Sequence, residues 1–414
     1  MNRTGSVKRT VARRENAFAD AVARVYEQSA TGELENHTLY RELANAGVVE
    51  GAELARVEPV GKAKTAHSVA RRRVRWAQQT LKHLGVLERT GAGRGRWQLT
   101  ARSREELTPP PARAVLIAFA TDLGIAVWGR AQDTFSRLGE VIDLCVVSPP
   151  YPLRKPRRYG NPTVDEYIDF VSKVLEPIVR NLRDGGSIAL NVSNDIFEPG
   201  SPARSTYVEE LVLTLCKRFA LSKMDQLPWV NKCKPPGPTQ WSSIQRMQLR
   251  TGYEHVYWLT SNPKAVRADN RRVLLPHSDR QAKLIQQGGE RRVAVFSDGS
   301  YRLRRGSFGA ETAGRIPTNV LEFGHTCVDL RRTREAAVAA GLPLHGATMP
   351  LALADFLVRW LCPPDGLVVD PCAGWLTTGK AAEINGRRWI CSEQFAEYLA
   401  GAANRFGGEV LRTI

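Results

Sequence analysis

The sequence of 414 residues lacks the features that mark several classes of protein. No apolar run approaches the roughly 20 residues that a membrane-spanning helix needs, because the run Ala114–Ala120 is ended by Asp122. No apolar segment follows the basic N-terminus, so a secretory signal is not expected. Hydrophobic residues at 43% and charged residues at 24% exclude a wholly disordered chain, and the length favours two or three compact units.

The cysteines and histidines also show no ligand pattern. The seven cysteines include no C-x-x-C pair, and the seven histidines have no metal-ligand spacing. An odd number of widely spaced cysteines favours reduced thiols over a disulfide scaffold or a zinc ribbon. We therefore expect a cytoplasmic protein with no metal and no membrane partner.

Acidic residues are scarce relative to basic ones. The 59 lysines and arginines outnumber the 42 acidic residues, for a net charge of +17. A cytoplasmic protein with this balance commonly binds a polyanion, most often a nucleic acid. Residues 1–106 alone hold 20 basic and 12 acidic residues, and a proline-rich linker at 107–113 separates them from residues 114–414.

Residues 1–106 are predicted to form helices followed by a basic hairpin. The hydrophobic periodicity predicts helices at Ala17–Gln28, Thr38–Ala46 and Ala66–Leu84, and strands at Val86–Arg89 and Arg96–Thr100. This order resembles a winged helix-turn-helix, a common DNA-binding module. Its candidate DNA-binding residues are arginines of the third helix and the hairpin: Arg71, Arg72, Arg73, Arg75, Arg94 and Arg96. The alternative is a helical interaction domain whose arginines form a solvated face.

Past the linker, strands and helices alternate, which predicts an α/β sheet. The first chemical motif there is Ser148-Pro149-Pro150-Tyr151, which follows the apolar run Leu144–Val147. Consecutive prolines cannot extend a strand ladder, so the chain leaves the sheet at the carboxyl end of a buried strand, where ligands bind in open α/β sheets. The Ser148 hydroxyl and a nearby carbonyl can accept hydrogen bonds, and the Tyr151 ring offers a stacking surface. Together these groups suit a planar heterocycle with an exocyclic amine. An ordinary strand-to-loop turn is the alternative.

The second motif is a strand, loop and helix within Gly366–Phe406. The strand leads into Asp370–Leu376, a loop of mostly small residues, and Glu393 ends the next strand 23 residues after Asp370. An acid at that place can bind ribose hydroxyls. The sequence has no Walker lysine and no G-x-G-x-x-G, so a cofactor with ribose and adenine but no pyrophosphate fits best, and S-adenosylmethionine is the candidate. A plain βαβ packing unit is the alternative.

In this order, the two motifs resemble the DNA amino-methyltransferases whose catalytic motif precedes the cofactor loop. The resemblance runs from about Val127 to Phe406 and includes GYEHVYWLT (252–260), RIPTNVLEFGH (315–325) and HGATMP (345–350). It implies a Rossmann-like methyltransferase sheet with permuted motif order, S-adenosylmethionine as the cofactor and double-stranded DNA as the substrate. In this family S-P-P-Y is typical of cytosine-N4 enzymes, and D-P-P-Y of adenine-N6 enzymes.

The resemblance also implies roles for individual residues. Ser148, Pro149, Pro150 and Tyr151 would be catalytic, and the cofactor-binding residues would be Asp370, Pro371, Cys372, Ala373, Gly374, Thr377, Thr378, Glu393, His345 and Pro350. Three positions depart from the family and bear on cofactor affinity. Trp375-Leu376 is expected to place a bulky leucine in the cofactor loop, Arg130 stands where an aspartate is common, and Met349 replaces an aromatic residue.

The chemistry of an exocyclic amine indicates how these residues would act. The methyl group of S-adenosylmethionine is carried by a positive sulfonium, so in-line transfer needs alignment and no covalent intermediate. We expect a flipped base to stack on Tyr151, while Ser148 and the Pro149 carbonyl accept hydrogen bonds from its amine. Carbon-5 methylation would need a Pro-Cys nucleophile in the catalytic loop, so Cys362 and Cys372 are interpreted as structural.

Target recognition is expected in residues 264–313. This insertion has 11 basic and five acidic residues and a predicted hairpin at Val293–Phe296 and Tyr301–Arg305. The candidate DNA-binding residues are Arg302, Arg304 and Arg305 in the hairpin, and Arg154, Lys155, Arg157 and Arg158 after the catalytic motif. A solvated surface is the alternative for each basic group.

These patterns predict a site-specific DNA methyltransferase that modifies the N4 amine of cytosine. By family expectation it would belong to a restriction-modification system, with a separate endonuclease as a further partner. Adenine-N6 methylation is the nearest alternative, and nucleoside identity would decide between them. An inactive DNA-binding regulator with a methylase-like body is another, which cofactor titration would discriminate. RNA methylation is a third and weaker alternative.

Overall fold

The structure is a computed structural model that divides the chain into two compact units, Met1–Glu106 and Leu107–Ile414. It describes residues 18–406, apart from residues 20, 24, 27–28, 30–32, 61–64, 84–86, 91–94, 100–106, 154–156, 158, 232–233, 235–236 and 326. No helix in this described part is both long enough and apolar enough to span a bilayer.

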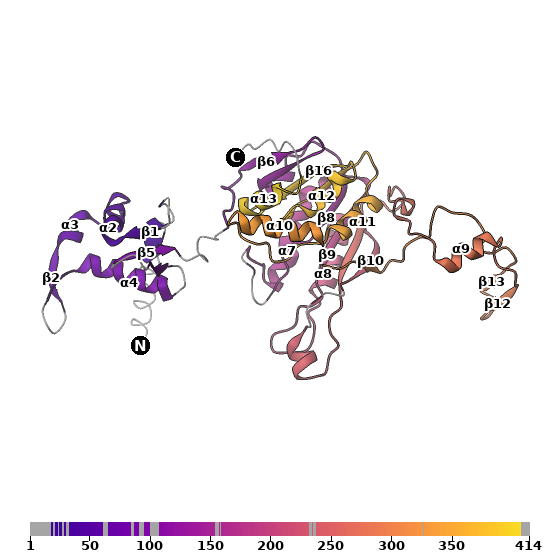
Figure 1. Cartoon of the computed structure of the whole chain (residues 1–414), viewed down its shortest axis with the longest axis horizontal. Coiled ribbons are helices and arrows are strands. Elements are labelled where there is room, and N and C mark those ends of the chain that lie inside the picture. Colours follow the sequence, from indigo (N-terminus) through magenta and orange to yellow (C-terminus); the bar gives the residue numbers. More distant parts are fainter. Residues whose placement is uncertain are drawn as a thin grey trace. The chain divides into compact units, whose positions relative to one another are not determined.

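The first unit is a small α+β domain (Figure 1). The described residues between 18 and 26 are helical, and the remaining elements are β1 (Glu33–Glu35), α2 (Asn36–Asn45), α3 (Gly51–Ala55), β2 (Val57–Val60), β3 (Thr65–Ser68), α4 (Val69–His83), β4 (Leu87–Arg89) and β5 (Arg96–Leu99). Strands β1, β5 and β4 form an antiparallel sheet in that order, and β2 pairs with β3. The predicted β4–β5 hairpin is therefore present, while its turn at residues 91–94, with Arg94, lies outside the described residues.

The long helix α4 starts later than its sequence pattern predicts. Val74, Ala77 and Leu81 recur at helical spacing and are buried, as expected. The predicted start at Ala66 is wrong, because Thr65–Ser68 pair with β2 and Ser68 Oγ accepts a hydrogen bond from the Arg71 amide at 3.2 Å. A serine that satisfies a free amide in the first turn fixes where a helix begins.

The second unit is built on a nine-stranded sheet. Its strands are β6 (Val115–Ala120), β7 (Gly124–Gly129), β8 (Ile142–Val147), β9 (Leu182–Val192), β10 (Ser222–Val230), β11 (Tyr253–Thr260), β14 (Leu321–Glu322), β15 (Leu367–Asp370) and β16 (Arg388–Glu393). Their spatial order is β14-β10-β11-β9-β8-β15-β16-β7-β6. The central five, β9-β8-β15-β16-β7, run parallel, whereas β11 and β6 run antiparallel to their neighbours.

Helices cover both faces of this sheet (Figure 1). One face packs against α6 (Ala131–Phe135), α7 (Val164–Arg180) and α8 (Tyr207–Phe219), and the other against α10 (Val328–Ala339), α11 (Leu351–Leu361), α12 (Thr377–Ile384) and α13 (Ala396–Ala403). The alternation along β8 explains this arrangement. Leu144 and Val146 contribute to one core, and Cys145 and Val147 to the other. The predicted α/β sheet is confirmed, with β8 and β15 at its centre.

Two segments extend from the sheet. Residues 264–313 contain η2 (Asn270–Val273), α9 (Asp279–Gln286) and the hairpin of β12 (Ala294–Phe296) and β13 (Tyr301–Leu303), close to the predicted hairpin. The loop between β10 and β11 contains the short helix η1 (Thr239–Ile244). The linker residue Thr108 belongs to the second unit, since its amide donates to Glu397 at 2.9 Å.

Candidate active site

The sheet brings the two sequence motifs to one edge. Strands β8 and β15 are parallel neighbours, with Val368 and Val369 paired to Leu144 and Cys145. Their carboxyl ends therefore lie side by side, and Ser148-Pro149-Pro150-Tyr151 and the loop after Asp370 both begin there. A cavity of about 700 Å³ opens at this edge and is lined by both motifs. Motifs more than 200 residues apart in the chain thus share one site.

The catalytic motif is held by hydrogen bonds to the end of β9. Ser148 Oγ donates to Asn191 Oδ1 at 3.2 Å and lies 3.2 Å from Tyr151 Oη. Tyr151 Oη is 2.9 Å from the same Asn191 oxygen. Because the Ser148 proton is directed to Asn191, the lone pairs of its oxygen are left to accept from another donor.

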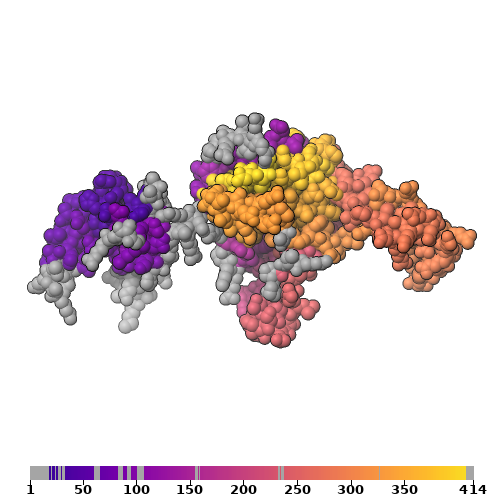
Figure 2. All heavy atoms as spheres, in the orientation of Figure 1, coloured from indigo at the N-terminus to yellow at the C-terminus, as the bar shows by residue number. Residues whose placement is uncertain are grey.

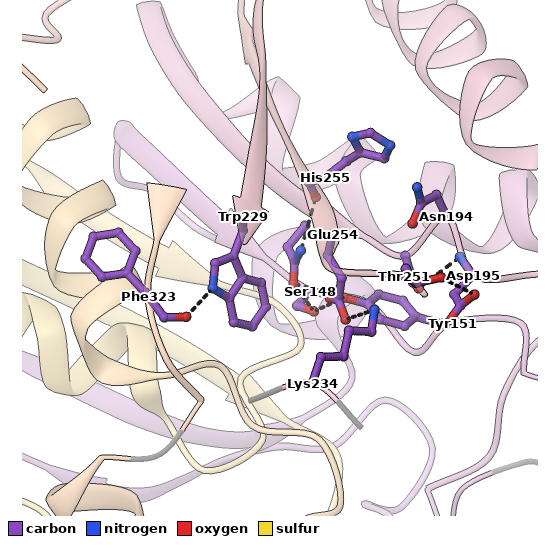
Figure 3. Close-up of polar contacts among 12 residues, drawn as sticks. Ser148, Tyr151, Asn194, Asp195, Trp229, Lys234, Thr251, Glu254, His255 and Phe323 are labelled. Atoms are coloured by element: carbon purple, nitrogen blue, oxygen red, sulfur yellow. Dashed lines mark hydrogen bonds and ion pairs between the residues drawn. The ribbon is translucent and has the colours of Figure 1, made fainter. Parts of the chain in front are cut away.

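A partly buried ion pair lies beside the tyrosine (Figure 3). Tyr151 Oη is 3.0 Å from Glu254 Oε2, and Lys234 Nζ is 3.3 Å from Glu254 Oε1. The side chains of Lys234 and Glu254 are 16% and 20% exposed. Burial, reinforced by the Glu254 charge, raises the pKa of Tyr151 well above its usual value, so the hydroxyl stays protonated.

Asn191 and Glu254 were missed by the sequence analysis, although a signal for both exists. Asn191 is a polar residue near the end of the apolar strand β9, and Glu254 is the second residue of the antiparallel strand β11. The start of an antiparallel strand lies at the same sheet edge as the ends of its parallel neighbours. Polar residues at these two places in buried strands therefore mark the same site as the S-P-P-Y motif.

The cofactor loop is organised around two buried carboxylates. Asp370 accepts from Thr378 Oγ1 at 2.7 Å and from the Cys372 amide at 3.0 Å. Glu393 accepts from the Gly374 amide at 2.8 Å and from the Phe395 amide at 3.0 Å. Burial raises the pKa of Asp370 to about 6 and that of Glu393 to about 7.

The side chains around the cofactor loop fit S-adenosylmethionine. Both Glu393 oxygens keep acceptor capacity that vicinal ribose hydroxyls can use, and Phe395 and Tyr159 add aromatic surface to the lining. No cluster of three or more His, Cys, Asp or Glu side chains that could hold a metal ion occurs in the described part of the chain.

His345 packs beside the cofactor loop. Its ring stacks on Tyr159 with centroids 5.4 Å apart, and a Cβ atom placed on Gly374 would come within 2.8 Å of His345 Nε2. Burial, and to a smaller extent Arg157, lowers the pKa of His345 to about 4, so the imidazole is neutral near pH 7. Gly374, at φ +52°, is therefore required both by the turn and by this contact.

Most of the predicted catalytic and cofactor residues line the cavity. These are Ser148, Pro149, Pro150, Tyr151, Asp370, Pro371, Cys372, Ala373, Gly374, Thr377, Thr378, Glu393 and His345. Pro350 is an exception: it caps α11 and lies outside the cavity lining. Thr377 and Thr378 face the cavity, yet their hydroxyls are bonded to Arg405 and Asp370.

The three departures from the family pattern have different positions. Arg130 and Met349 line the cavity. The expectation that Leu376 crowds the cofactor is wrong, because this side chain is fully buried in the hydrophobic core and is absent from the cavity lining, whereas Trp375 lines it. Cys372 also lines the cavity, but burial raises its thiol pKa well above the usual value, which makes it a poor nucleophile.

The predicted DNA-binding residues are spread over both units. Arg71, Arg72, Arg73 and Arg75 are exposed on α4. The Arg73 guanidinium carbon lies 4.0 Å from the centroid of the Phe18 ring, and Arg96 lies within 3.9 Å of Glu33 and Glu35. Arg302, Arg304 and Arg305 are exposed on or beside β13, and Arg157 lines the cavity. Arg154, Lys155 and Arg158 lie outside the described residues.

Two family models and a curated relative match parts of the chain. The family model described as DNA methylase matches residues 142–404, and the model described as Mrr N-terminal domain matches residues 18–108. The type II methyltransferase M.PvuII of Proteus hauseri is 29% identical over 267 residues, which cover 64% of this chain and 78% of the relative.

Solved structures are similar as well. The PvuII cytosine-N4-specific DNA methyltransferase has 24% identity and a TM-score of 0.54, with 71% of this chain and 89% of that chain covered. The M1.HpyAVI structure in complex with SAM has 14% identity and a TM-score of 0.38, covering 66% of this chain and 93% of that chain. The first of these similarities establishes the fold.

Proposed function

Since the chain belongs to the DNA methylase family, which it matches over residues 142–404, we propose that it transfers a methyl group from S-adenosylmethionine to the N4 amine of a cytosine in double-stranded DNA. The observation that carries the proposal is the shared cavity, which is lined both by Ser148 and Tyr151 and by Asp370 and Glu393. The serine in the S-P-P-Y motif and the similarity to M.PvuII support cytosine as the base.

The catalytic residues would act by alignment. S-adenosylmethionine supplies a methyl group on a positive sulfonium, which needs no activation by the protein. Ser148 Oγ, whose proton goes to Asn191, and the Pro149 carbonyl would accept hydrogen bonds from the amine and hold its lone pair in line. The Tyr151 ring, fixed through its hydroxyl to Asn191 and Glu254, would stack on the flipped base.

Basic residues of both units would hold the DNA. The arginines of α4 and β13 and Arg157 are exposed, and they would contact phosphates or base edges. Such an enzyme would act in the cytoplasm, and its natural setting would be a restriction-modification system with a separate endonuclease.

Nucleoside mass spectrometry of DNA from cells that express the chain tests the proposal. We expect N4-methylcytosine with the wild-type chain and none with Ser148→Ala. N6-methyladenine in its place would move the chain to the adenine enzymes. If the soluble chain binds S-adenosylmethionine weakly or not at all and leaves DNA unmodified, a DNA-binding regulator would be the better explanation.

A further inference from the structure

A loop beside the active site exposes a cluster of apolar side chains. It comprises residues 231–252, between β10 and β11, and its described residues form the pink projection at the bottom of Figures 1 and 2. Leu249 is 90% exposed, Ile244 66% and Met247 57%. Leu249 is the most exposed large apolar side chain in the described part of the chain. Isolated exposed apolar residues are ordinary, but three within six residues of one loop indicate a binding surface.

The charge of this loop has one sign. Residues 231–252 contain four basic residues and no acidic residue. Arg246 and Arg250 are exposed and flank Met247 and Leu249 in the sequence. Cationic side chains bind phosphates, and apolar side chains between them can enter the base stack of a duplex. The composition of the tip therefore fits DNA.

The loop is folded on itself. Ser242 Oγ donates to the Pro238 carbonyl at 2.8 Å, and the Met247 amide donates to the Trp241 carbonyl at 2.9 Å. The Thr251 amide closes the loop by donating to the Gly237 carbonyl at 2.8 Å. A preformed tip loses little conformational entropy when it binds.

Both ends of the loop are attached to the active site. At the first end, Lys234 pairs with Glu254, which contacts the Tyr151 hydroxyl. At the other end, Thr251 Oγ1 donates to Asp195 Oδ1 at 3.0 Å, and Asp195 lines the cavity (Figure 3). These contacts anchor both ends of the loop beside the cavity where the flipped base would lie.

We propose that this loop is a wedge that enters the target DNA beside the flipped base, with Leu249 as the side chain inserted into the base stack. The inference rests on the proposed function, because only an enzyme that flips its base has a gap to fill. Flipping costs unstacking and unpairing, and an apolar wedge replaces part of the lost stacking. The substrate duplex, and not a second copy of the chain, is the occupant, since the tip is cationic and attached to the catalytic motif.

A comparison of paired and unpaired targets tests the wedge. The methylated sites of plasmid DNA from expressing cells are mapped, and one of them is placed in a duplex oligonucleotide. Leu249→Ala is expected to lower kcat/KM on the paired duplex about tenfold, equivalent to about 1.4 kcal/mol. On the same duplex with an abasic site opposite the target cytosine, the variant and the wild type should differ by less than about twofold, because less pairing and stacking must be broken.

Two variants control for other effects. Leu213→Ala removes a leucine that is 59% exposed on α8 and should leave both rates unchanged. Leu249→Met keeps an apolar wedge and should retain most of the activity on the paired duplex. Thermal unfolding of all three variants should match the wild type, since both leucines are exposed.

Four outcomes would overturn the wedge. Equal rates of Leu249→Ala and the wild type on the paired duplex would do so, as would an equal loss on paired and abasic duplexes. A change in oligomeric state by light scattering that accounts for the lost rate would make the tip a self-association surface. If the wild-type chain methylates no DNA, the proposed function fails and the wedge fails with it, a result distinct from the other three.

Discussion

The Tyr151 hydroxyl contacts three side chains that hold the ring in place. Removing the hydroxyl alone therefore tests how much this positioning contributes, while the ring stays available for stacking. Its oxygen lies 2.9–3.2 Å from polar atoms of Ser148, Asn191 and Glu254. Tyr151→Phe keeps the stacking ring and is expected to lower the single-turnover methylation rate about tenfold, since a hydrogen bond to a charged group contributes about 1.5–3 kcal/mol. Tyr151→Ala should cost at least about tenfold more, because the ring itself is lost.

The same two variants provide the check on this expectation. Affinity for S-adenosylmethionine should be unchanged in both, because Tyr151 contacts none of the cofactor-loop carboxylates in the described structure. Equal rates for Tyr151→Phe and the wild type would show that the contacts to Asn191 and Glu254 do not position the ring.

The raised pKa of Glu393 predicts a pH-dependent cofactor affinity. Burial raises this pKa from 4.5 to about 7, and we expect the ionised form to accept the ribose hydroxyls. Between pH 8 and pH 6 the ionised fraction falls about tenfold, and the association constant for S-adenosylmethionine by calorimetry should fall with it. Glu393→Gln should bind more weakly at pH 8 and lose most of this pH dependence.

Folding stability depends on the ionisation of Glu393 in the opposite direction, so loss of stability cannot explain a fall in cofactor affinity at low pH. Because the folded-state pKa of Glu393 lies above its unfolded value, the folded state binds the proton more tightly. The contribution to stability is complete below pH 4.5 and is lost as pH rises through about 7. The free protein therefore gains stability from this group between pH 7 and pH 6, while cofactor affinity falls. A constant affinity across this range would contradict a carboxylate–ribose contact.

Leu376 is a core residue on a strained backbone, which predicts an effect on stability and not on the cofactor. Its side chain is fully buried and its φ is +56°. Leu376→Ala should lower the free energy of unfolding in urea by about 2–5 kcal/mol. Leu376→Gly should be less destabilised than Leu376→Ala by about 1 kcal/mol, because glycine adopts the left-handed region without a Cβ clash. Tighter cofactor binding by the folded Leu376→Ala protein would restore the sequence-based expectation that this side chain impairs cofactor binding.

The β12–β13 hairpin offers a test of DNA binding by one element. Arg302, Arg304 and Arg305 are exposed there, and each phosphate contact contributes about 0.9 to the slope of log affinity against log salt concentration. Replacing all three by glutamine should reduce the slope, measured by fluorescence anisotropy with a cognate duplex, by up to about 2.7. A matched control replaces Arg331, Arg332 and Arg334 on α10, which are also exposed. An equal change of slope in both triple variants would show that the slope depends on net charge and not on phosphate contacts made by the hairpin.

Elements with a strong hydrophobic pattern were predictable from the sequence, and contacts between distant segments were not. The buried strands β8 and β15 and the amphipathic part of α4 follow from apolar runs and helical spacing. The β2–β3 hairpin was missed because each strand has only four residues, β2 contains Pro59, and the pairing of the strands competes with the helical pattern at Ala66. In the site, Ser148 and Asp370 were found through the turns that follow their strands. Glu254 could be assigned only once β11 was known to start at the same sheet edge.

The two units have separate hydrophobic cores, which makes independent folding the expectation. The core of the first unit consists of residues between Phe18 and Leu99, and the two cores of the second lie between Phe119 and Phe406. Every residue that lines the active-site cavity belongs to the second unit. The first unit resembles a DNA-binding module, so its contribution should be to DNA affinity and not to the methyl-transfer step.

Removal of residues 1–106 therefore separates binding from chemistry. The chain of residues 107–414 is expected to keep the affinity of the full chain for S-adenosylmethionine, because Asp370, Glu393 and their partners are all retained. Its salt-dependence slope for duplex DNA should be smaller by about 2–4, as the exposed arginines of α4 are lost. With saturating DNA, the single-turnover rate should match that of the full chain. A truncated chain with the same DNA affinity and slope would assign the first unit to protein interaction, since its arginines would then contact no phosphate.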